Sequence, residues 1–362
     1  MISNAVQNIL NTIRDKSVQK GLRDMITRDK SVNQFSALDY GDRIETGIKE
    51  IQAAESSTNS IGAALPLHIY VPPGTHTLTA PITITRHNVT LSVDGGARII
   101  PPSNQAAIVF DGPSTTEGYI KNWGLFMHGV IWPTGAGGAS QHGVIFRHAI
   151  HGTAYINEIR ALGGSALYFD GANFSNKIDF NRLHGCVGWG IQSANDVGHA
   201  QPLRIANLVT GEIQACTAGA ANFLQWYDGH MYLRVENFST SLPLVVFNDS
   251  HSILFSGYFE NPSNLGGDDI KVMATTSGCE DLVFDNVRFH EQKDVGSYNI
   301  NLVLGSVFGL TLRQIRAGTI ASRFLFIGGG GNTKITKFPE ANYQSGAVTN
   351  NAGAEYKSVT IA

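Results

Sequence analysis

Two patterns of hydrophobic and polar residues divide the chain near residue 32. Residues 1–32 are rich in helix formers, and their apolar positions follow a narrow heptad-like stripe of Ile2, Val6, Ile9, Ile13, Val18, Leu22 and Met25. This spacing predicts an N-terminal helix. Because a short helix with a narrow apolar stripe is marginal alone, the segment either forms a trimerisation neck with two identical copies or folds back on its own domain.

From Val32 onward the pattern changes to short apolar runs separated by Gly, Asn and Asp, which is typical of many short strands. One amphipathic helix is predicted over residues 43–54, where Ile44, Ile48 and Ile51 recur at helical spacing. We expect this helix to cap the first edge of the β-structure, because an uncovered edge strand would pair with another chain.

The β region contains a repeat. An apolar triplet that ends in an aromatic residue and precedes a polar one occurs at 108–112, 144–148, 167–171, 225–229 and 245–249. An apolar-x-Asn-apolar unit alternates with it and contains Asn122, Asn207, Asn237 and Asn286. Repeats of this kind cannot close a core alone, so they stack and align equivalent residues in columns.

The repeat predicts an all-β fold, a parallel β-helix over residues 33–335 with the Asn residues as an inward ladder, followed by an irregular capping tail at 336–362. A β-sandwich is the rival fold. It would favour hairpin turns such as Asn-Gly, and the sequence contains no Asn-Gly pair.

The opening of the β region carries recognisable motifs. Residues 35–42 read FSALDYGD, and residues 68–78, after the predicted helix, read HIYVPPGTHTL. These segments resemble the start of the right-handed parallel β-helix of pectate-lyase-like proteins, where a GA-x-GDG-x-x-DDT stretch forms the cap and V-x-x-PPGTY begins the first coil. The sequence departs from that pattern at residues 42–46, where DRIET replaces the usual acidic pair.

The resemblance implies a protein that acts on polysaccharide, as pectate lyases, polygalacturonase-like hydrolases and bacteriophage tailspikes do. The helical N-terminal segment and the lack of an apolar signal sequence favour the tailspikes. We therefore expect a homotrimer that is made in the host cytoplasm, joins other virion proteins through its N-terminal segment and acts outside the cell on a capsule, exopolysaccharide or O-antigen.

Cleavage of a polysaccharide needs two carboxylates beside the glycosidic bond, or a base with a cation for β-elimination. In the repeat alignment Asp170 and Asp228 follow equivalent strands two rungs apart, about 9 to 10 Å. They form the predicted catalytic pair, and Glu260 and Glu291, which each end an aromatic strand, are alternative acids. The predicted glycan contacts are Arg147, His148, Trp226, Tyr227, His230 and Arg234.

Hydrolysis is the favoured reaction on this spacing. A lyase acting by β-elimination, and an adhesin or virion structural protein that binds glycan without cutting it, stay open as alternatives.

Composition narrows the partners. The 26 Lys and Arg and 29 Asp and Glu residues give a net charge of −3, which does not provide the basic surface that nucleic acid needs. No apolar run is long enough to insert into a membrane. Cys186, Cys216 and Cys279 form no metal-binding or disulfide pattern, and no acidic cluster demands calcium. We therefore predict no metal and no cofactor.

Overall fold

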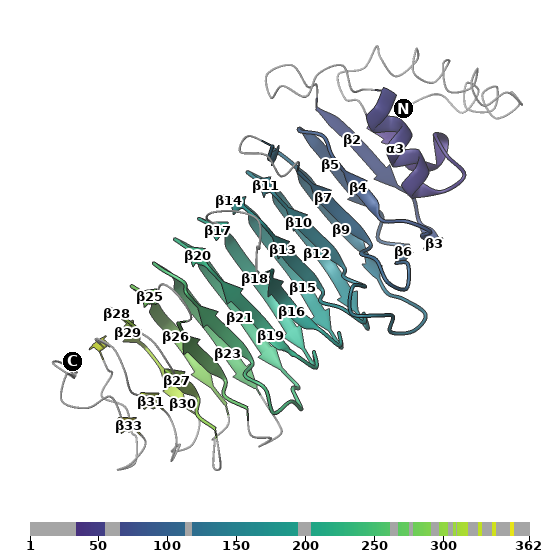
Figure 1. Cartoon of the computed structure of the whole chain (residues 1–362). Coiled ribbons are helices and arrows are strands. Elements are labelled where there is room, and N and C mark those ends of the chain that lie inside the picture. Colours follow the sequence, from purple (N-terminus) through teal and green to yellow (C-terminus); the bar gives the residue numbers. More distant parts are fainter. Residues whose placement is uncertain are drawn as a thin grey trace, which may run out of the picture.

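The computed structural model describes residues 34–54, 66–112, 118–194, 204–260, 267–274, 278–290, 297–302, 307–308, 310–317, 325–327, 335–337 and 348–350. In these residues successive coils of chain stack along one axis, and the strand pairs of both long sheets are parallel (Figure 1). The predicted parallel β-helix is confirmed, and the antiparallel sandwich is excluded. The helix predicted within residues 1–32 lies outside the described residues.

The longest sheet, called sheet A here, has 15 strands. Its main path is β1 (Gln34–Ser36), β2 (Leu67–Val71), β5 (Val89–Val93), β9 (Gly124–Ile131), β12 (Thr153–Arg160), β15 (Lys177–His184), β18 (Leu208–Gln214), β21 (His230–Glu236), β23 (Leu254–Glu260), β26 (Val283–Phe289), β29 (Leu310–Arg313) and β32 (Ile335–Lys337). Off this path lie β3 (Gly74–Thr77), β6 (Ala97–Ile100) and β30 (Arg316–Ala317).

Sheet B has 11 strands and faces sheet A across the core. They are β4 (Ile82–Ile84), β7 (Ile108–Asp111), β10 (Val144–Arg147), β13 (Leu167–Asp170), β16 (Trp189–Ser193), β19 (Gly219–Leu224), β22 (Val245–Asn248), β24 (Ile270–Met273), β27 (Ile300–Leu302), β31 (Leu325–Ile327) and β33 (Val348–Asn350).

Short strands form a third face between sheets B and A. They are β8 (Ile120–Lys121) with β11 (Ala149–Ile150), β14 (Asn173–Phe174) with β17 (Arg204–Ile205) and β20 (Trp226–Tyr227), and β25 (Cys279–Glu280) with β28 (Val307–Phe308). Each coil thus runs from sheet A through sheet B to this face and back.

The core consists of columns of like side chains, because the strands pair in register. Phe110, Phe146 and Phe169 occupy one position on three successive rungs, with ring centroids 5.8 and 5.2 Å apart. Burial alternates along strands of sheet A such as β21 and β23, so every second side chain points outward. The outward positions therefore form columns of their own, where chemistry can be placed.

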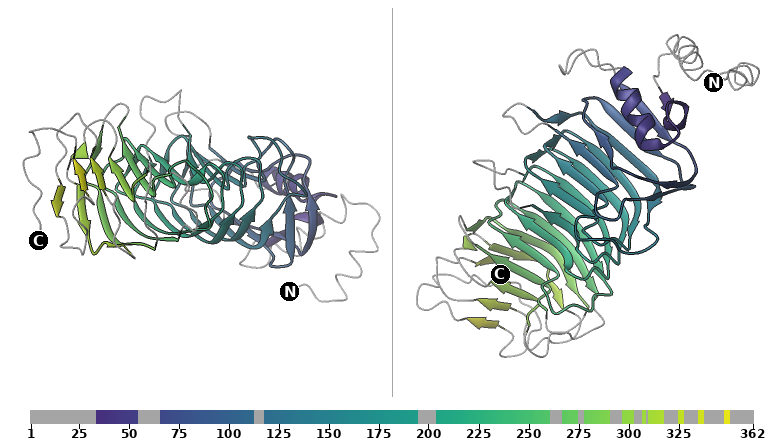
Figure 2. Two further views of the ribbon diagram at one scale, coloured as in Figure 1. Left: turned by 90° about the horizontal axis from the view of Figure 1, so that it is seen from below. Right: turned by 45° about the vertical axis from the view of Figure 1, so that its right-hand side comes forward.

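The capping helix was predicted over 43–54 and is found as α3 (Ile44–Ala54), beside the short 3-10 helix η1 (Ala37–Asp39). Its apolar stripe, Ile44, Ile48 and Ile51, is buried over the first coils. Figure 2 shows α3 at one end of an elongated rod and the last strands at the other.

The predicted asparagine ladder forms only in part. Asn207 is buried, and its Oδ1 accepts a hydrogen bond from Nδ2 of Asn176 at 3.1 Å. Asn122, Asn237 and Asn286 are instead exposed and have φ of 55°, 57° and 55°. Asn122 and Asn237 lie at turns, and Asn286 lies at an irregularity within β26. All three have left-handed backbone, which asparagine tolerates better than most residues. The prediction was wrong for these three, because the short motif does not specify the position within a coil.

The boundary predicted at residue 335 was also wrong. It falls inside β32, and β33 still pairs in parallel with β31, so parallel strand pairing extends beyond that boundary.

Candidate functional site

The predicted equivalence of Asp170 and Asp228 is contradicted by the strand register. Asp170 ends β13 in sheet B, whereas Asp228 follows β20 on the third face and lies in the turn before β21. Residues Gly219–Leu224, and not 225–228, supply the sheet B strand of that coil. The motif at 225–229 thus resembles a sheet B strand in sequence but lies on the third face of its coil. Asp170 and Asp228 therefore do not share a column.

Asp170 instead belongs to an ion-paired column at the end of sheet B. Nε of Arg147 lies 2.8 Å from Oδ2 of Asp170, and its Nη1 lies 3.0 Å from Oδ1 of Asp111. The guanidinium therefore occupies the space between the two carboxylates. The carboxylate of Asp170 is thus ion-paired with Arg147 in the sheet B column that also holds Asp111.

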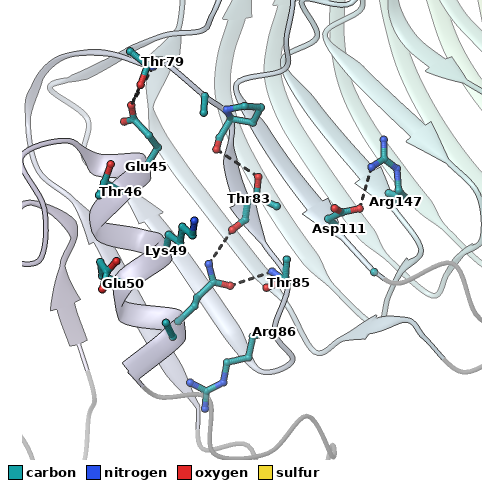
Figure 3. A pocket seen from close by; sticks show the side chains of 15 residues that line it. Glu45, Thr46, Lys49, Glu50, Thr79, Thr83, Thr85, Arg86, Asp111 and Arg147 are labelled. Atoms are coloured by element: carbon teal, nitrogen blue, oxygen red, sulfur yellow. Dashed lines mark hydrogen bonds and ion pairs between the residues drawn. The ribbon is translucent and has the colours of Figure 1, made fainter.

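A cleft of about 1260 Å³ lies beside this column, between α3 and sheet B (Figure 3). Much of its polar lining attaches the cap. Oε1 of Glu45 accepts hydrogen bonds from the backbone N–H and hydroxyl of Thr79, and Gln52 donates to the carbonyl of Thr83 at 2.8 Å. Figure 3 shows Glu45 directed from α3 toward Thr79.

Trp226 is a core residue, so the predicted glycan contact there was wrong. Its side chain is fully buried, its ring lies 5.0 Å from those of Phe169 and Phe223, and its indole N–H donates to Oγ of Ser193 at 2.7 Å. Tyr227, next along the chain, is half-buried and stacks on His251 with ring centroids 4.9 Å apart.

The remaining predicted site residues divide between two regions. His148 is buried in the turn after β10, where its Nδ1 accepts the N–H of Ala172 at 3.3 Å. His230 and Arg234 on β21 and Glu260 on β23 all lie on sheet A. Glu291 lies outside the described residues.

The outer face of sheet A carries a column of alternating charge. The in-register pairs run Glu158, Arg182, Glu212, Arg234, Tyr258 and Arg288 along successive rungs. Nη2 of Arg182 lies 2.7 Å from Oε1 of Glu158, and Nε of Arg234 lies 3.8 Å from Oε2 of Glu212. Exposed ion pairs of this kind contribute little stability, so the density of charge here points to recognition or chemistry.

The neighbouring column places two carboxylates on adjacent rungs. Glu236 on β21 pairs in register with Glu260 on β23. Glu236 binds Nε of Arg234 with one oxygen and accepts from Nε2 of Gln214 at 3.2 Å with the other. The hydroxyl of Tyr258 donates to Oε2 of Glu260 at 3.2 Å. This is the candidate active site.

The electrostatics of the cluster follow from these contacts. The hydrogen bond to Glu236, together with the charges of Glu236, Glu212 and Glu260, raises the pKa of Arg234. Partial burial and the charge of Glu260 raise the pKa of Tyr258, so its phenol stays protonated at neutral pH. Arg234 is therefore a permanent cation beside a protonated phenol and three glutamates.

Exposed aromatic rings extend along the same sheet. Tyr232, two residues before Arg234 on β21, is 53% exposed. Phe126 on β9 and Trp132 just after it are 38% and 36% exposed. The guanidinium carbons of Arg98 and Arg160 lie 4.1 and 3.6 Å from the Trp132 ring centroid. Rings with polar neighbours suit the faces and hydroxyls of sugars.

Sequence reasoning found Arg234 and Glu260 but missed Glu236, Tyr258 and Glu212. Each of these residues occupies an outward position of a sheet A strand, and the repeat motifs were aligned on sheet B and on the turns. Alternation within HMYLRVE and LFSGYFE, once assigned to one sheet, is the signal that would have found them.

Searches with the sequence found neither a matching family model nor a matching curated protein. The fold is similar to that of DFA-IIIase from Arthrobacter chlorophenolicus A6 in complex with GF2, with a TM-score of 0.61 at 13% identity over 90% of this chain and 99% of that one. The same enzyme without its lid gives 0.57 at 13% identity, over 90% of this chain and 100% of the other.

ORF18 of Geobacillus virus E2 gives a TM-score of 0.45 at 13% identity, covering 85% of this chain and 62% of that protein. At these identities the likeness concerns the fold, the parallel β-helix. Among the residues that the structure describes, no helix has both the length and the apolar character needed to cross a bilayer.

Proposed function

We propose that this protein is a bacteriophage tailspike that binds a bacterial surface polysaccharide and cleaves it by glycoside hydrolysis on the outer face of sheet A. The observation that carries the proposal is the pairing of Glu236 with Glu260 on neighbouring rungs, beside Arg234 and Tyr258. The resemblance of the cap motifs to polysaccharide-active β-helix proteins, tailspikes among them, supports it.

The rung spacing favours hydrolysis with retention. Neighbouring strands lie about 4.8 Å apart, and retaining glycosidases hold their two carboxyl groups roughly 5–5.5 Å apart. Inverting enzymes need about 6.5–9.5 Å, to admit a water between carboxylate and sugar. Glu236 and Glu260 therefore suit direct attack on the sugar, in place of the inverting spacing expected for Asp170 and Asp228.

The hydrogen bonds support a division of roles between the two glutamates. Both oxygens of Glu236 are held by donors, Arg234 and Gln214, which fix the position of the carboxylate for attack as the nucleophile. Glu260 has one oxygen on Tyr258 and, in its protonated form, gives its proton to the leaving glycosidic oxygen as Glu236 bonds to the anomeric carbon. Glu260 then takes a proton from the water that hydrolyses the glycosyl ester.

The lyase alternative fits the site less well. Arg234 and Arg288 each lie 5.8 Å from the Tyr258 ring and could neutralise a uronate carboxylate. β-Elimination also needs a base for the proton beside that carboxylate. The raised pKa of Tyr258, due to burial and the charge of Glu260, makes its phenol a poor base at neutral pH.

The test is incubation of the full chain with purified capsule, exopolysaccharide and O-antigen, with assays for reducing ends and for the ultraviolet absorbance of an unsaturated uronate. Hydrolysis yields reducing ends without the absorbance, a lyase yields both, and a pure adhesin yields neither. Glu236→Gln and Glu260→Gln should each lower the rate by about 100-fold or more, while Asp170→Asn keeps it. Loss in Asp170→Asn but not in the glutamate variants would refute the assignment.

Assembly is tested separately. A homotrimer in solution has three times the 39.0 kDa of the chain, and removal of residues 1–32 should lower its stability if that segment is the neck. A monomeric full chain would contradict the tailspike assignment without touching the chemistry of the glutamates.

A further inference from the structure

A second concave site lies where the coils turn from sheet A into sheet B, away from the glutamates. It is a cavity of about 330 Å³ lined by His142, Ser165, Tyr168 and Gln192, with glycines of two successive turns among the other lining residues. Its volume is at the small end of the range for ligand pockets, roughly 300–1,000 Å³. Such a space holds one sugar ring and not a chain.

Hydrogen bonds inside the wall fix the orientation of the Gln192 amide. Oγ of Ser165 accepts the backbone N–H of Trp189 at 3.1 Å, so its own proton goes to Oε1 of Gln192 at 2.6 Å. The NH₂ group of Gln192 is therefore available to donate to a ligand. No hydrogen bond among the described residues uses it.

The aromatic wall also retains unused polar atoms. The His142 ring stacks on Tyr168 with centroids 4.4 Å apart, and its Nδ1 accepts the backbone N–H of Ser165 at 3.0 Å. Burial lowers the pKa of His142, so the ring is neutral near pH 7 and carries its proton on Nε2. Within the described residues neither this N–H nor the Tyr168 hydroxyl has a hydrogen-bond partner.

The chemistry of this cavity differs from that of the sheet A face. No Asp, Glu, Lys or Arg lines it, whereas the candidate active site is a cluster of glutamates and arginines. An aromatic wall, two N–H donor groups and a hydroxyl without partners among the described residues match the apolar face and hydroxyls of an uncharged sugar. A charged sugar would find no charged side chain in the lining with which to pair.

We propose that this cavity, defined by His142, Tyr168 and Gln192, is a binding subsite for a single uncharged pyranose unit, separate from the sheet A glutamates. The inference does not depend on cleavage. It would anchor a neutral sugar of a glycan around the corner from the proposed cleavage site.

The experiment is ligand-detected saturation-transfer NMR on the full-length protein, with the methyl glycosides of glucose, galactose, mannose and N-acetylglucosamine as probes. Val187 lines the cavity and is 50% exposed, so Val187→Trp fills the entrance without disturbing the core. Leu242, 49% exposed in a corresponding turn two coils further on, provides the matched control Leu242→Trp.

At least one probe should bind the wild type at millimolar concentration and lose its signal in Val187→Trp, while Leu242→Trp retains it. Gln192→Ala and Tyr168→Phe should each weaken binding about threefold or more, by loss of one hydrogen bond. Binding by Glu236→Gln should equal that of the wild type, which separates this proposal from the cleavage proposal. The absence of any probe signal, or its persistence in Val187→Trp, overturns the inference.

Discussion

Substitution of Trp226 tests whether this residue lies in the core, as the strand register places it, or on the glycan-binding surface. The residue lies in the densest aromatic stretch of the chain and was predicted to meet glycan, yet its side chain is fully buried. We therefore expect Trp226→Phe to change the free energy of unfolding and to leave glycan binding and cleavage unchanged.

The magnitude follows from two losses. Removing the indole N–H leaves the Ser193 hydroxyl, 4% exposed, without its donor, which costs about 1–3 kcal/mol. The smaller ring also leaves a cavity of roughly 40 Å³, which at about 24 cal/mol per Å³ costs a further ~1 kcal/mol. The expected loss is thus about 2–4 kcal/mol.

The assay is equilibrium unfolding in urea followed by circular dichroism, with glycan binding measured on the folded variants. Tyr232→Phe, at a ring that is 53% exposed, is the control and should change stability by less than about 0.5 kcal/mol. The double variant Trp226→Phe with Ser193→Ala should lose less unfolding free energy than the sum of the two single losses, because both substitutions remove the same hydrogen bond. Unchanged stability with lost glycan binding would refute the placement of Trp226 in the core.

Three further predictions concern the stack itself. Asn207→Ala removes hydrogen bonds to the N–H and Nδ2 of Asn176 and to the carbonyl of Asn173. It should lower the free energy of unfolding, measured by urea titration, by about 2–4 kcal/mol. A loss under about 0.5 kcal/mol would contradict this prediction. In Gly47→Ala the new Cβ would lie 1.8 Å from the carbonyl oxygen of Ala37, so amide hydrogen exchange across α3 should accelerate, whereas Gly135→Ala, with nothing within 4 Å, should match the wild type. Burial raises the pKa of the Cys279 thiol to about 12, above its unfolded value, so the stability that the buried neutral thiol contributes is complete below about pH 9 and is lost as pH rises toward 12. Over that window the unfolding free energy of Cys279→Ala should therefore improve relative to that of the wild type, by up to roughly 1.4 kcal/mol per pH unit. Parallel pH profiles of the two proteins would count against this prediction.

The fold could be predicted because it depends on local and repeated signals. Ile44, Ile48 and Ile51 recur at helical spacing and are buried as the cap, and the triplets at 108–112, 144–148 and 167–171 pair in register as neighbouring rungs. Each coil buries the same few side chains, so a pattern that repeats in the sequence repeats in space.

The candidate site could not be predicted in this way, because it depends on which face of a coil each motif occupies. The segments at 167–171 and 225–229 look alike, yet the first ends a strand of sheet B and the second lies on the third face. A coil that differs in length by a few residues moves a motif from one face to the next, and no local preference records that shift.

The sequence by itself therefore determined the kind of molecule: a stacked, parallel, capped solenoid with alternating buried and exposed positions. Only the tertiary structure decided that Arg147 lies between Asp111 and Asp170, that Trp226 is internal, and that Glu236 meets Glu260. The physical reason is that side-chain periodicity is set within a strand, whereas the neighbours across a rung are set by the length of every intervening turn.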